Sequence, residues 1–318
     1  MPAPANNNKK PWLIAAWPGM GNVAVIAAAY LVQKLPMTPV GELPPRGHFD
    51  VPQVLVKQGV IGTPRLPRSV LYRWNDPEGG RDLLVFIGEA QPTAGLYAFA
   101  HEMLDRAAQL NVERVYTFAS MASQLHPSKD PKVFGAATTP PLAAELRQQK
   151  LIMLDDGQIG GLNGVLLGAA AERGIPGLCL LGEIPFFAAG VPNPKAAKAV
   201  LSAFSNLAGI HIDLAELAAH AETVDTALVD LLDRLREQAR ERGADEELPL
   251  PEEPADIEET ESANEPELDP TSVARIERMF EVAMQDRSQA VRLKEELDRL
   301  GVFDKYENRF LDLFRRGE

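Results

Sequence analysis

The stretch WPGMGNVA, residues 17–24, decides whether the first half of the chain is a dinucleotide-binding fold or another α/β fold. It follows the apolar run WLIAA, residues 12–16, and leads into AVIAAAYLVQKL, residues 24–35, which has a helical pattern. Read from Gly19, the letters fit the glycine fingerprint of dinucleotide-binding loops, with alanine in the third small position. Glycines here also permit a tight strand-to-helix turn without any ligand. Two interpretations are therefore open: a phosphate-binding loop or a structural turn.

Three features agree with a dinucleotide loop: the strand before it, the helix after it, and Glu42, an acid about 20 residues on where a ribose contact is expected. A fourth feature disagrees. The domain would need a helix after its second strand, but residues 43–53, LPPRGHFDVPQ, are rich in proline and have no helical period. We therefore favour the structural turn, at whose helix N-terminus free N–H groups can still meet an anion.

Strand patterns alternate with helix patterns over residues 11–243, which predicts an α/β core with a largely parallel sheet covered on both faces. The proline-rich segments 36–45 and 63–67 are predicted to be loops. Strands are expected at Trp12–Trp17, Gln53–Lys57, Ser69–Trp74, Leu83–Ile87, Val112–Phe118, Lys132–Ala136, Leu151–Leu154 and Ile175–Leu181. Helices are expected at Val23–Leu35, Gly95–Gln109, Pro141–Gln149, Leu162–Arg173 and Pro194–Leu207.

A further helix is predicted after Asp213, which can cap it, with an apolar stripe from Leu214 to Leu235.

Residues 1–10 are expected to be a flexible tail. Residues 271–318 carry two amphipathic patterns and predict a helical hairpin. Because two such helices alone bury little surface, we expect the hairpin to dock on the core or on a neighbouring subunit. The docking residues would be Ile276, Phe280, Phe310 and Phe314.

The net charge of −13 belongs to one segment rather than to the fold. Residues 244–270 contain twelve acids, five prolines and no lysine or arginine, and without those acids the chain has 33 acids against 32 bases. Such a segment cannot bury enough apolar surface to order itself, so it predicts a disordered acidic linker. No basic face is indicated, and nucleic acid is not an expected partner.

The single cysteine, Cys179, excludes an internal disulfide, and its apolar setting GLCLLG predicts a buried, unreactive thiol.

Prolines and glycines interrupt the apolar stretch after Lys10, which argues against a signal peptide. No segment reaches the roughly 18 uninterrupted apolar residues of a membrane span. We therefore expect a cytoplasmic protein without a membrane partner.

Two Gly-Glu pairs follow apolar strands, in LLVFIGEAQP (83–92) and LCLLGEIP (178–185). Glu89 and Glu183 can therefore lie at one edge of the sheet, where paired carboxylates support acid–base or glycosidic chemistry. The favoured alternative is that they accept backbone N–H bonds or pair with arginines. GQIGGLNG, residues 157–164, supports phosphate or carboxylate binding and a tight packing turn about equally well.

Signatures of other catalytic classes are absent from the sequence. There is no Walker loop, no G-x-S-x-G nucleophile elbow and no H-E-x-x-H pair. The five histidines are scattered, and no group has the spacing of a metal site. We predict no catalytic residue, no metal and no cofactor.

Taken together, WPGMGNVAVIAAAYL, FIGEAQP, VFGAATT, GQIGGLNGVLLG and LLGEIPFFA, followed by NPKAAKAVL, resemble the second proteasome assembly chaperone family over residues 11–241. DRSQAVRLKEELDRLGVFDKYENRFLDLF resembles the C-terminal helices of some prokaryotic members. The resemblance implies a three-layer α/β/α fold similar to phosphorylases and hydrolases, a homo-oligomer that is often a trimer, and binding of proteasome subunits.

One departure weakens that last implication. Members that dock on proteasome rings often end in a hydrophobic residue, tyrosine and any residue, whereas this chain ends in RRGE. Tyr306 is internal and follows Lys305, so it does not replace that motif. Proteasome subunits therefore stay one possible class of client among others.

Two functions follow from these observations. The first is a non-enzymatic, homo-oligomeric assembly chaperone or scaffold. The alternative is an enzyme or ligand-binding protein, similar to nucleoside or amide hydrolases, that uses a cleft at the strand ends; dinucleotide binding ranks third. Side chains converging on one cleft would favour the alternative, whereas a cleft filled by Trp17, Met20 and Met121 would favour the scaffold. The candidate cleft comprises Gly19, Met20, Gly21, Asn22, Glu89, Gln91, Gly161, Asn163 and Glu183.

Overall fold

The computed structural model describes residues 10–45, 47–50, 54–154 and 156–241, with a few residues nearer the C-terminus. The chain divides into two compact units, Met1–Glu253 and Pro254–Glu318. The second unit is described only at Arg275, Ile276, Arg278, Met279, Phe280 and Leu293. The predicted tail, the acidic linker and most of the helical hairpin, including Phe310 and Phe314, lie outside the described residues.

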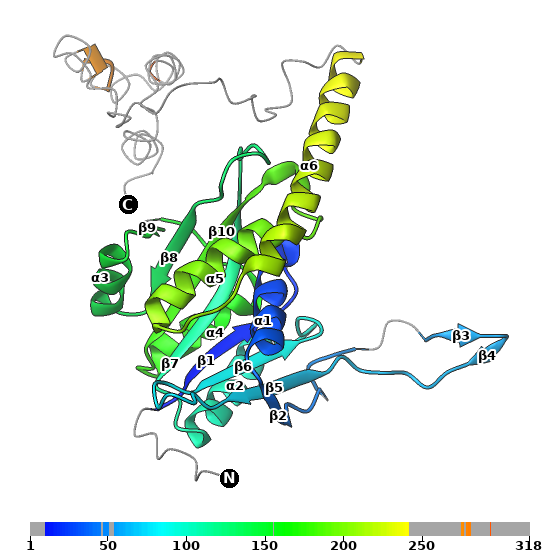
Figure 1. Ribbon diagram of the computed structural model, residues 1–318, viewed down its shortest axis with the longest axis vertical. Helices are drawn as coiled ribbons and strands as arrows, with labels where there is room; N and C mark the ends of the chain where they lie inside the picture. The colour runs from blue at the N-terminus through cyan, green and yellow to red at the C-terminus, as the bar shows by residue number, and fades with distance from the viewer. Residues whose placement is uncertain are drawn as a thin grey trace, which may run out of the picture. The chain divides into compact units, whose positions relative to one another are not determined.

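The first unit is built on an eight-stranded sheet with the strand order β2-β5-β6-β1-β7-β10-β8-β9 (Figure 1). A separate two-stranded hairpin, β3–β4, extends away from it. The sheet strands are β1 (Trp12–Ala16), β2 (Thr38–Glu42), β5 (Ser69–Trp74), β6 (Leu83–Gly88), β7 (Arg114–Ser123), β8 (Val133–Ala137), β9 (Ile152–Met153) and β10 (Gly177–Pro185). The hairpin strands are β3 (Val56–Lys57) and β4 (Val60–Ile61).

Four central strands, β6, β1, β7 and β10, run parallel, and β1 and β10 are buried along their whole length. The outer pairs β2–β5, β5–β6 and β8–β10 are antiparallel, so the sheet is mixed, and the prediction of a largely parallel sheet is wrong there. For β5 and β6 the reason lies in the connection. A parallel neighbour needs a crossover, usually a helix, whereas only a loop over residues 75–82 joins β5 to β6.

Helices cover both faces of the sheet, as predicted for an α/β fold. On one face lie α1 (Val23–Lys34) and α5 (Pro194–Ala208), and on the other α2 (Leu96–Gln109) and α4 (Gly161–Glu172). The short α3 (Pro140–Gln148) packs at the β8–β9 edge. Within the described ranges, no helix combines the length and apolar character that crossing a membrane requires.

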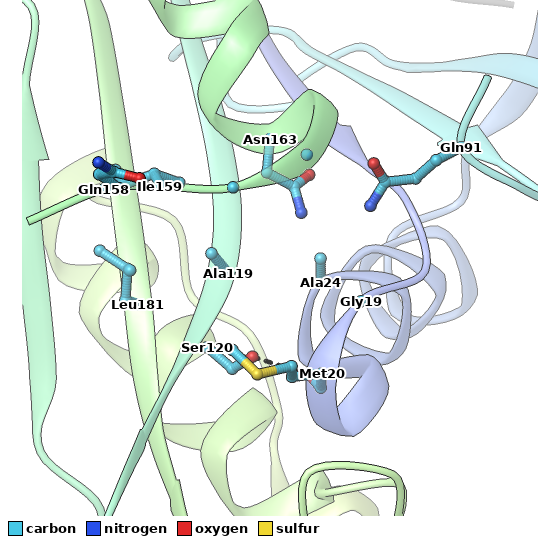
Figure 2. A pocket seen from close by; sticks show the side chains of 12 residues that line it. Gly19, Met20, Ala24, Gln91, Ala119, Ser120, Gln158, Ile159, Asn163 and Leu181 are labelled. Carbon is cyan, nitrogen blue, oxygen red and sulfur yellow. Dashed lines mark hydrogen bonds between the residues drawn. The ribbon is translucent and has the colours of Figure 1, made fainter. Parts of the chain in front are cut away.

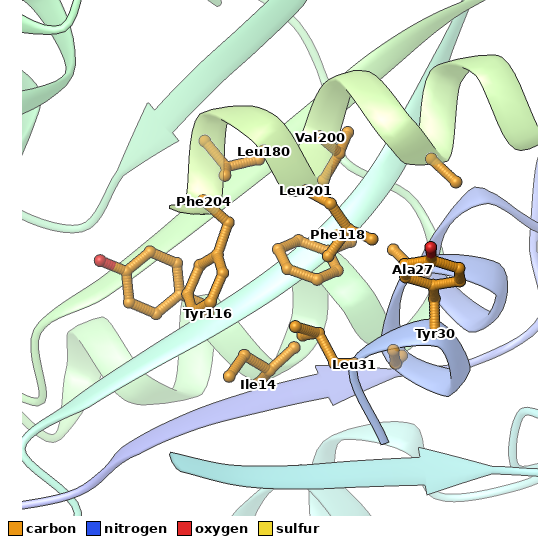
Figure 3. Packing of buried hydrophobic residues seen from close by; sticks show 14 of the residues in the cluster. Ile14, Ala27, Tyr30, Leu31, Tyr116, Phe118, Leu180, Val200, Leu201 and Phe204 are labelled. Atoms are coloured by element: carbon orange, nitrogen blue, oxygen red, sulfur yellow. The ribbon is translucent and has the colours of Figure 1, made fainter. Parts of the chain in front are cut away.

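Aromatic packing holds α5 on the sheet (Figure 3). The ring of Phe204 lies 5.1 Å from that of Tyr116 and 5.8 Å from that of Phe118, both in edge-to-face geometry. Ile14 and Leu31 complete the same fully buried layer. Each such side chain contributes about 1.5–3 kcal/mol through apolar burial, so this face fixes the positions of α1 and α5 on the sheet.

Two segments sharpen or correct the sequence predictions. The proline-rich segment predicted as a loop contains β2, which pairs with β5 as an edge strand, the place where a sheet tolerates proline. The helix predicted after Asp213 is α6 (Ala215–Glu241), and the Asp213 carboxylate accepts the N–H of Ala215 at 3.0 Å. Its buried stripe contains Leu217, Ala221, Leu228 and Leu232.

The WPGMGN segment forms a tight turn from β1 into α1 through a short 3₁₀ turn, η1 (Met20–Asn22). Gly21 and Asn22 have φ of 61° and 48°, in the left-handed region. The Gly21 N–H donates to the Ala189 carbonyl at 2.7 Å, and the Gly21 carbonyl accepts from the Asn193 N–H at 2.8 Å. The turn is therefore bound to the loop between β10 and α5, and left-handed backbone favours glycine there.

Gly21→Ala should lower the free energy of unfolding by about 1–3 kcal/mol. The alanine would have to adopt the left-handed backbone conformation of Gly21, and its Cβ would lie 3.3 Å from the Asn193 Cβ. Gly19→Ala is the matched control two residues away: its φ is −161° and its Cβ would meet nothing within 4 Å. Chemical denaturation measures both. Equal stability of the two variants would contradict this description of the turn.

Cys179 should be unreactive in the folded protein. It is fully buried on β10, and burial raises the pKa of its thiol to about 12. Since only the thiolate reacts, Ellman's reagent at pH 8 should label native protein very slowly and should label one thiol per chain in guanidinium chloride. Rapid stoichiometric labelling without denaturant would show that β10 opens readily.

Candidate functional site

A cavity of about 260 Å³ lies at the carboxyl ends of the parallel strands (Figure 2). The turn after β1, the loop after β6, the end of β7, β10 and the start of α4 all contribute to it. Ligands bind at this edge of open α/β sheets because the loops there diverge. Its lining residues are Gly19, Met20, Ala24, Gln91, Ala119, Ser120, Gln158, Ile159, Gly160, Gly161, Asn163 and Leu181.

Gln91 fixes one wall of the cavity. Its Nε2 donates to the Pro18 carbonyl at 2.9 Å, and its Oε1 accepts from the Leu162 N–H at 3.0 Å. The side chain thus joins the WPGMGN turn to the first turn of α4. Gly161 permits this approach: its φ is 65°, and a Cβ there would lie 2.5 Å from the Gln91 Oε1. This bridge explains one glycine of the GQIGGLNG motif, Gly161.

Asn163 extends from α4 into the cavity (Figure 2). Only 5 % of this residue is exposed, and its Oδ1 has no hydrogen-bond partner among the described residues. Buried polar atoms are usually paired, and an unpaired one costs about 1–3 kcal/mol. The Asn163 Oδ1 is therefore a buried acceptor that a ligand in the cavity could satisfy.

The opposite part of the cavity is closed by Met20 and Ser120. The Ser120 hydroxyl donates to the Met20 carbonyl at 2.8 Å, which ties β7 to the turn after β1. Met20 is 48 % exposed, and Trp17 is fully buried against Phe86 at a ring distance of 5.3 Å. Met20 therefore bounds one side of the cavity, whereas Trp17 is packed in the core and does not fill it.

Glu183 does not line the cavity. It is 8 % exposed, and its carboxylate accepts the Ser123 hydroxyl at 2.7 Å and the Lys132 N–H at 3.0 Å. These bonds join β10, the end of β7 and the segment that leads into β8. The geometry agrees with the favoured sequence interpretation, in which this acid accepts hydrogen bonds inside the fold.

Glu89 also lies away from the cavity, at the end of β6. Its carboxylate accepts from Arg65 Nη2 at 2.6 Å and from the Arg68 N–H at 2.9 Å. Arg68 pairs in turn with Glu42 and lowers the pKa of that carboxyl. Glu42 thus has an arginine partner on the β2–β5 edge, and no helix occurs in the described residues between β2 and β5. Both facts weigh against dinucleotide binding.

The predicted cleft residues therefore fall into two groups. Gly19, Met20, Gln91, Gly161 and Asn163 line one cavity, whereas the rest lie elsewhere. Gly21 is buried against Asn193. The structure adds residues that the sequence analysis did not select. Three of them, Gln158, Ile159 and Gly160, belong to the quoted motif GQIGGLNG, and Ser120 lies two residues past the predicted end of a strand.

All the lining residues are uncharged. Helix α4 begins at the cavity, so its positive dipole end and first N–H groups favour an acceptor atom. Across the described ranges, no three acidic, histidine or cysteine side chains gather to hold a metal ion. The arrangement is suited to hydrogen bonding of a small polar molecule rather than to acid–base chemistry.

Comparison with known proteins identifies relatives of this chain. The PAC2 family model matches residues 13–232. The uncharacterized protein MJ1210 of Methanocaldococcus jannaschii is 33 % identical over 218 residues, which covers 67 % of this chain and 80 % of that protein.

Two crystal structures show the same fold. Pyrococcus furiosus PbaB, an archaeal proteasome activator, has 29 % identity and a TM-score of 0.60, over 70 % of this chain and 93 % of PbaB. The Mycobacterium tuberculosis proteasome-assembly chaperone homologue Rv2125 has 25 % identity and a TM-score of 0.60, over 69 % and 94 %. The resemblance drawn from the motifs is confirmed, and the chain belongs to the PAC2 family.

Proposed function

We propose that this chain acts by binding other proteins, as a homo-oligomeric assembly chaperone or scaffold of the cytoplasm. The observation that carries the proposal is the β3–β4 hairpin. Every residue from Val54 to Arg65 is exposed, including five large apolar side chains. They are Val54, Leu55, Val56, Val60 and Ile61, which are 44–73 % exposed.

The hairpin is a regular element with its own turn. Val56 pairs with Ile61 and Lys57 with Val60, and the Gly62 N–H donates to the Leu55 carbonyl at 2.8 Å. Gln58 and Gly59 both have positive φ, as a two-residue type I′ turn requires. An isolated hairpin of this length is marginal in water, so a partner that covers its apolar side chains would stabilise it.

Exposed apolar surface of this kind marks a protein-binding site. The hairpin also has two free strand edges, to which a partner strand can add by main-chain hydrogen bonds. The uncharged cavity supports the same proposal, since general acid–base catalysis needs a titratable group within hydrogen-bond reach of the reacting atom. The names of PbaB and Rv2125 make proteasome subunits the first class of client to test.

Replacing Leu55 and Ile61 by serine should weaken self-association or client binding at least tenfold, because each buried side chain of this type contributes about 1.5–3 kcal/mol. The melting temperature should hardly change, since both residues are exposed at 73 % and 69 %. Light scattering after gel filtration measures the oligomer. Titration with purified proteasome subunits of the source organism measures client binding.

Lys57→Gln is the matched control, because it changes an exposed polar side chain on the same hairpin. It should behave as the unmodified chain does in both assays. If the Leu55→Ser/Ile61→Ser double variant still forms the same oligomer and binds the same client equally well, the hairpin is not the binding element and the proposal fails.

Glu183→Gln tests the role of the buried carboxylate. Both bonds should weaken, because the neutral Gln amide can accept the Lys132 N–H with only its oxygen, and its NH₂ group then meets the Ser123 hydroxyl, which can no longer donate there. The free energy of unfolding should fall by about 1–3 kcal/mol. Glu89→Gln, at a half-exposed site, should have a smaller effect. A hydrolase activity that collapses in both variants, with stability unchanged, would favour an enzyme instead.

A further inference from the structure

The cavity at the start of α4 contains a hydrogen-bonding atom that no described residue pairs with. The Asn163 amide is 95 % buried, faces the cavity, and its Oδ1 lacks a partner among the described residues (Figure 2). An amide whose oxygen and nitrogen can exchange places offers one acceptor beside one donor. A ligand that presents a donor beside an acceptor would satisfy both atoms at once.

A second, separate feature points to the same place. The twelve-residue helix α4 begins at Gly160 and Gly161, which line the cavity and supply no capping side chain. Gln91 occupies the N–H of Leu162, the second residue of the helix. The N-terminal end carries partial positive charge, so it favours the acceptor oxygen of a ligand over its donor. The ligand would therefore be oriented with its carbonyl towards the helix.

Charge decides which acceptor is suited to the site. A carboxylate or phosphate in the cavity would lose hydration without gaining an ion partner, since no lining residue is charged. A neutral carbonyl needs no such partner. Met20, Ile159 and Leu181 supply apolar walls for the hydrocarbon part of a ligand.

The volume limits the size of the ligand. At about 260 Å³ the cavity is smaller than the roughly 300–1,000 Å³ of sites for drug-sized molecules. A single ring with a short substituent is the appropriate scale.

We propose that this cavity is a binding site for a small neutral lactam or carboxamide, recognised edge-on by the Asn163 amide with its carbonyl directed at the N-terminus of α4. The site is distinct from the β3–β4 hairpin, and its ligand is bound rather than hydrolysed. Protein binding through the hairpin does not depend on it.

Three probes test this proposal by titration in NMR with the full chain. 2-Piperidone carries the donor–acceptor edge, N-methyl-2-piperidone has the same ring with the donor blocked, and cyclopentanecarboxylate carries a full negative charge. We expect saturable binding of 2-piperidone, with the amide resonances of Gly160, Gly161 and Asn163 shifting, and binding of the other two at least tenfold weaker.

Asn163→Ala removes the recognising amide and should weaken binding of 2-piperidone at least tenfold, whereas Glu89→Gln, outside the cavity, should leave it unchanged. Should Asn163→Ala fail to fold, the comparison of the two lactams on the unmodified chain still decides the matter. Equal binding of both lactams, preference for the carboxylate, binding retained in Asn163→Ala, or no binding by any probe at tens of millimolar would each overturn the proposal.

Discussion

The burial of the parallel strands on both faces is the constraint on which the rest of this structure depends. β1 and β10 have no exposed residue, so their backbone groups must pair with neighbouring strands and their side chains must pack under helices on each side. Parallel pairing of β6, β1, β7 and β10 then requires that all four strands end at one edge. The segments that follow these strands lie at that edge, and the cavity lies among them.

Two bridges organise the edge. The main chain of Gly21 binds the loop before α5, and the side chain of Gln91 joins the turn after β1 to the start of α4. Both bridges depend on glycines, at Gly21 and Gly161, whose positive φ allows close approach. The glycine motifs thus have a structural role even where they line a cavity. WPGMGN resembles the glycine fingerprint of dinucleotide-binding loops because both need glycines for a tight strand-to-helix turn.

The sequence predicted the α/β core well, because helix and strand periods differ and the buried strands are continuously apolar. It missed β2, because the proline in Thr38–Glu42 is a strong local signal for a loop, whereas pairing at a sheet edge is a tertiary effect. It also missed the return strand of the β3–β4 hairpin, because Gln-Gly lacks the asparagine or aspartate that is typical of a type I′ turn. The antiparallel pairing at the edges of the sheet could not be predicted, because hydrophobic periodicity does not indicate the direction of a neighbouring strand.

The candidate site was predictable in part, for the same reason. Gln91 and Asn163 were both placed in the candidate cleft and line one cavity, but Glu89 and Glu183 were also placed there, and their arginine, hydroxyl and backbone partners come from segments distant in sequence. The two roles that we propose accordingly lie in two places: protein binding at an apolar hairpin on the outside, and ligand binding in an uncharged cavity at the sheet edge. The hairpin carries the proposed role, because protein partners require exposed surface.

Amide hydrogen exchange of residues 54–65 tests that role most directly. The measurement compares the chain at high dilution, at high concentration, and mixed with purified proteasome subunits of the source organism. If the hairpin is the binding element, its amides exchange rapidly at high dilution and become protected in the self-associated form or in the mixture. Equally rapid exchange under all three conditions, with protection appearing elsewhere on the chain, would contradict the account.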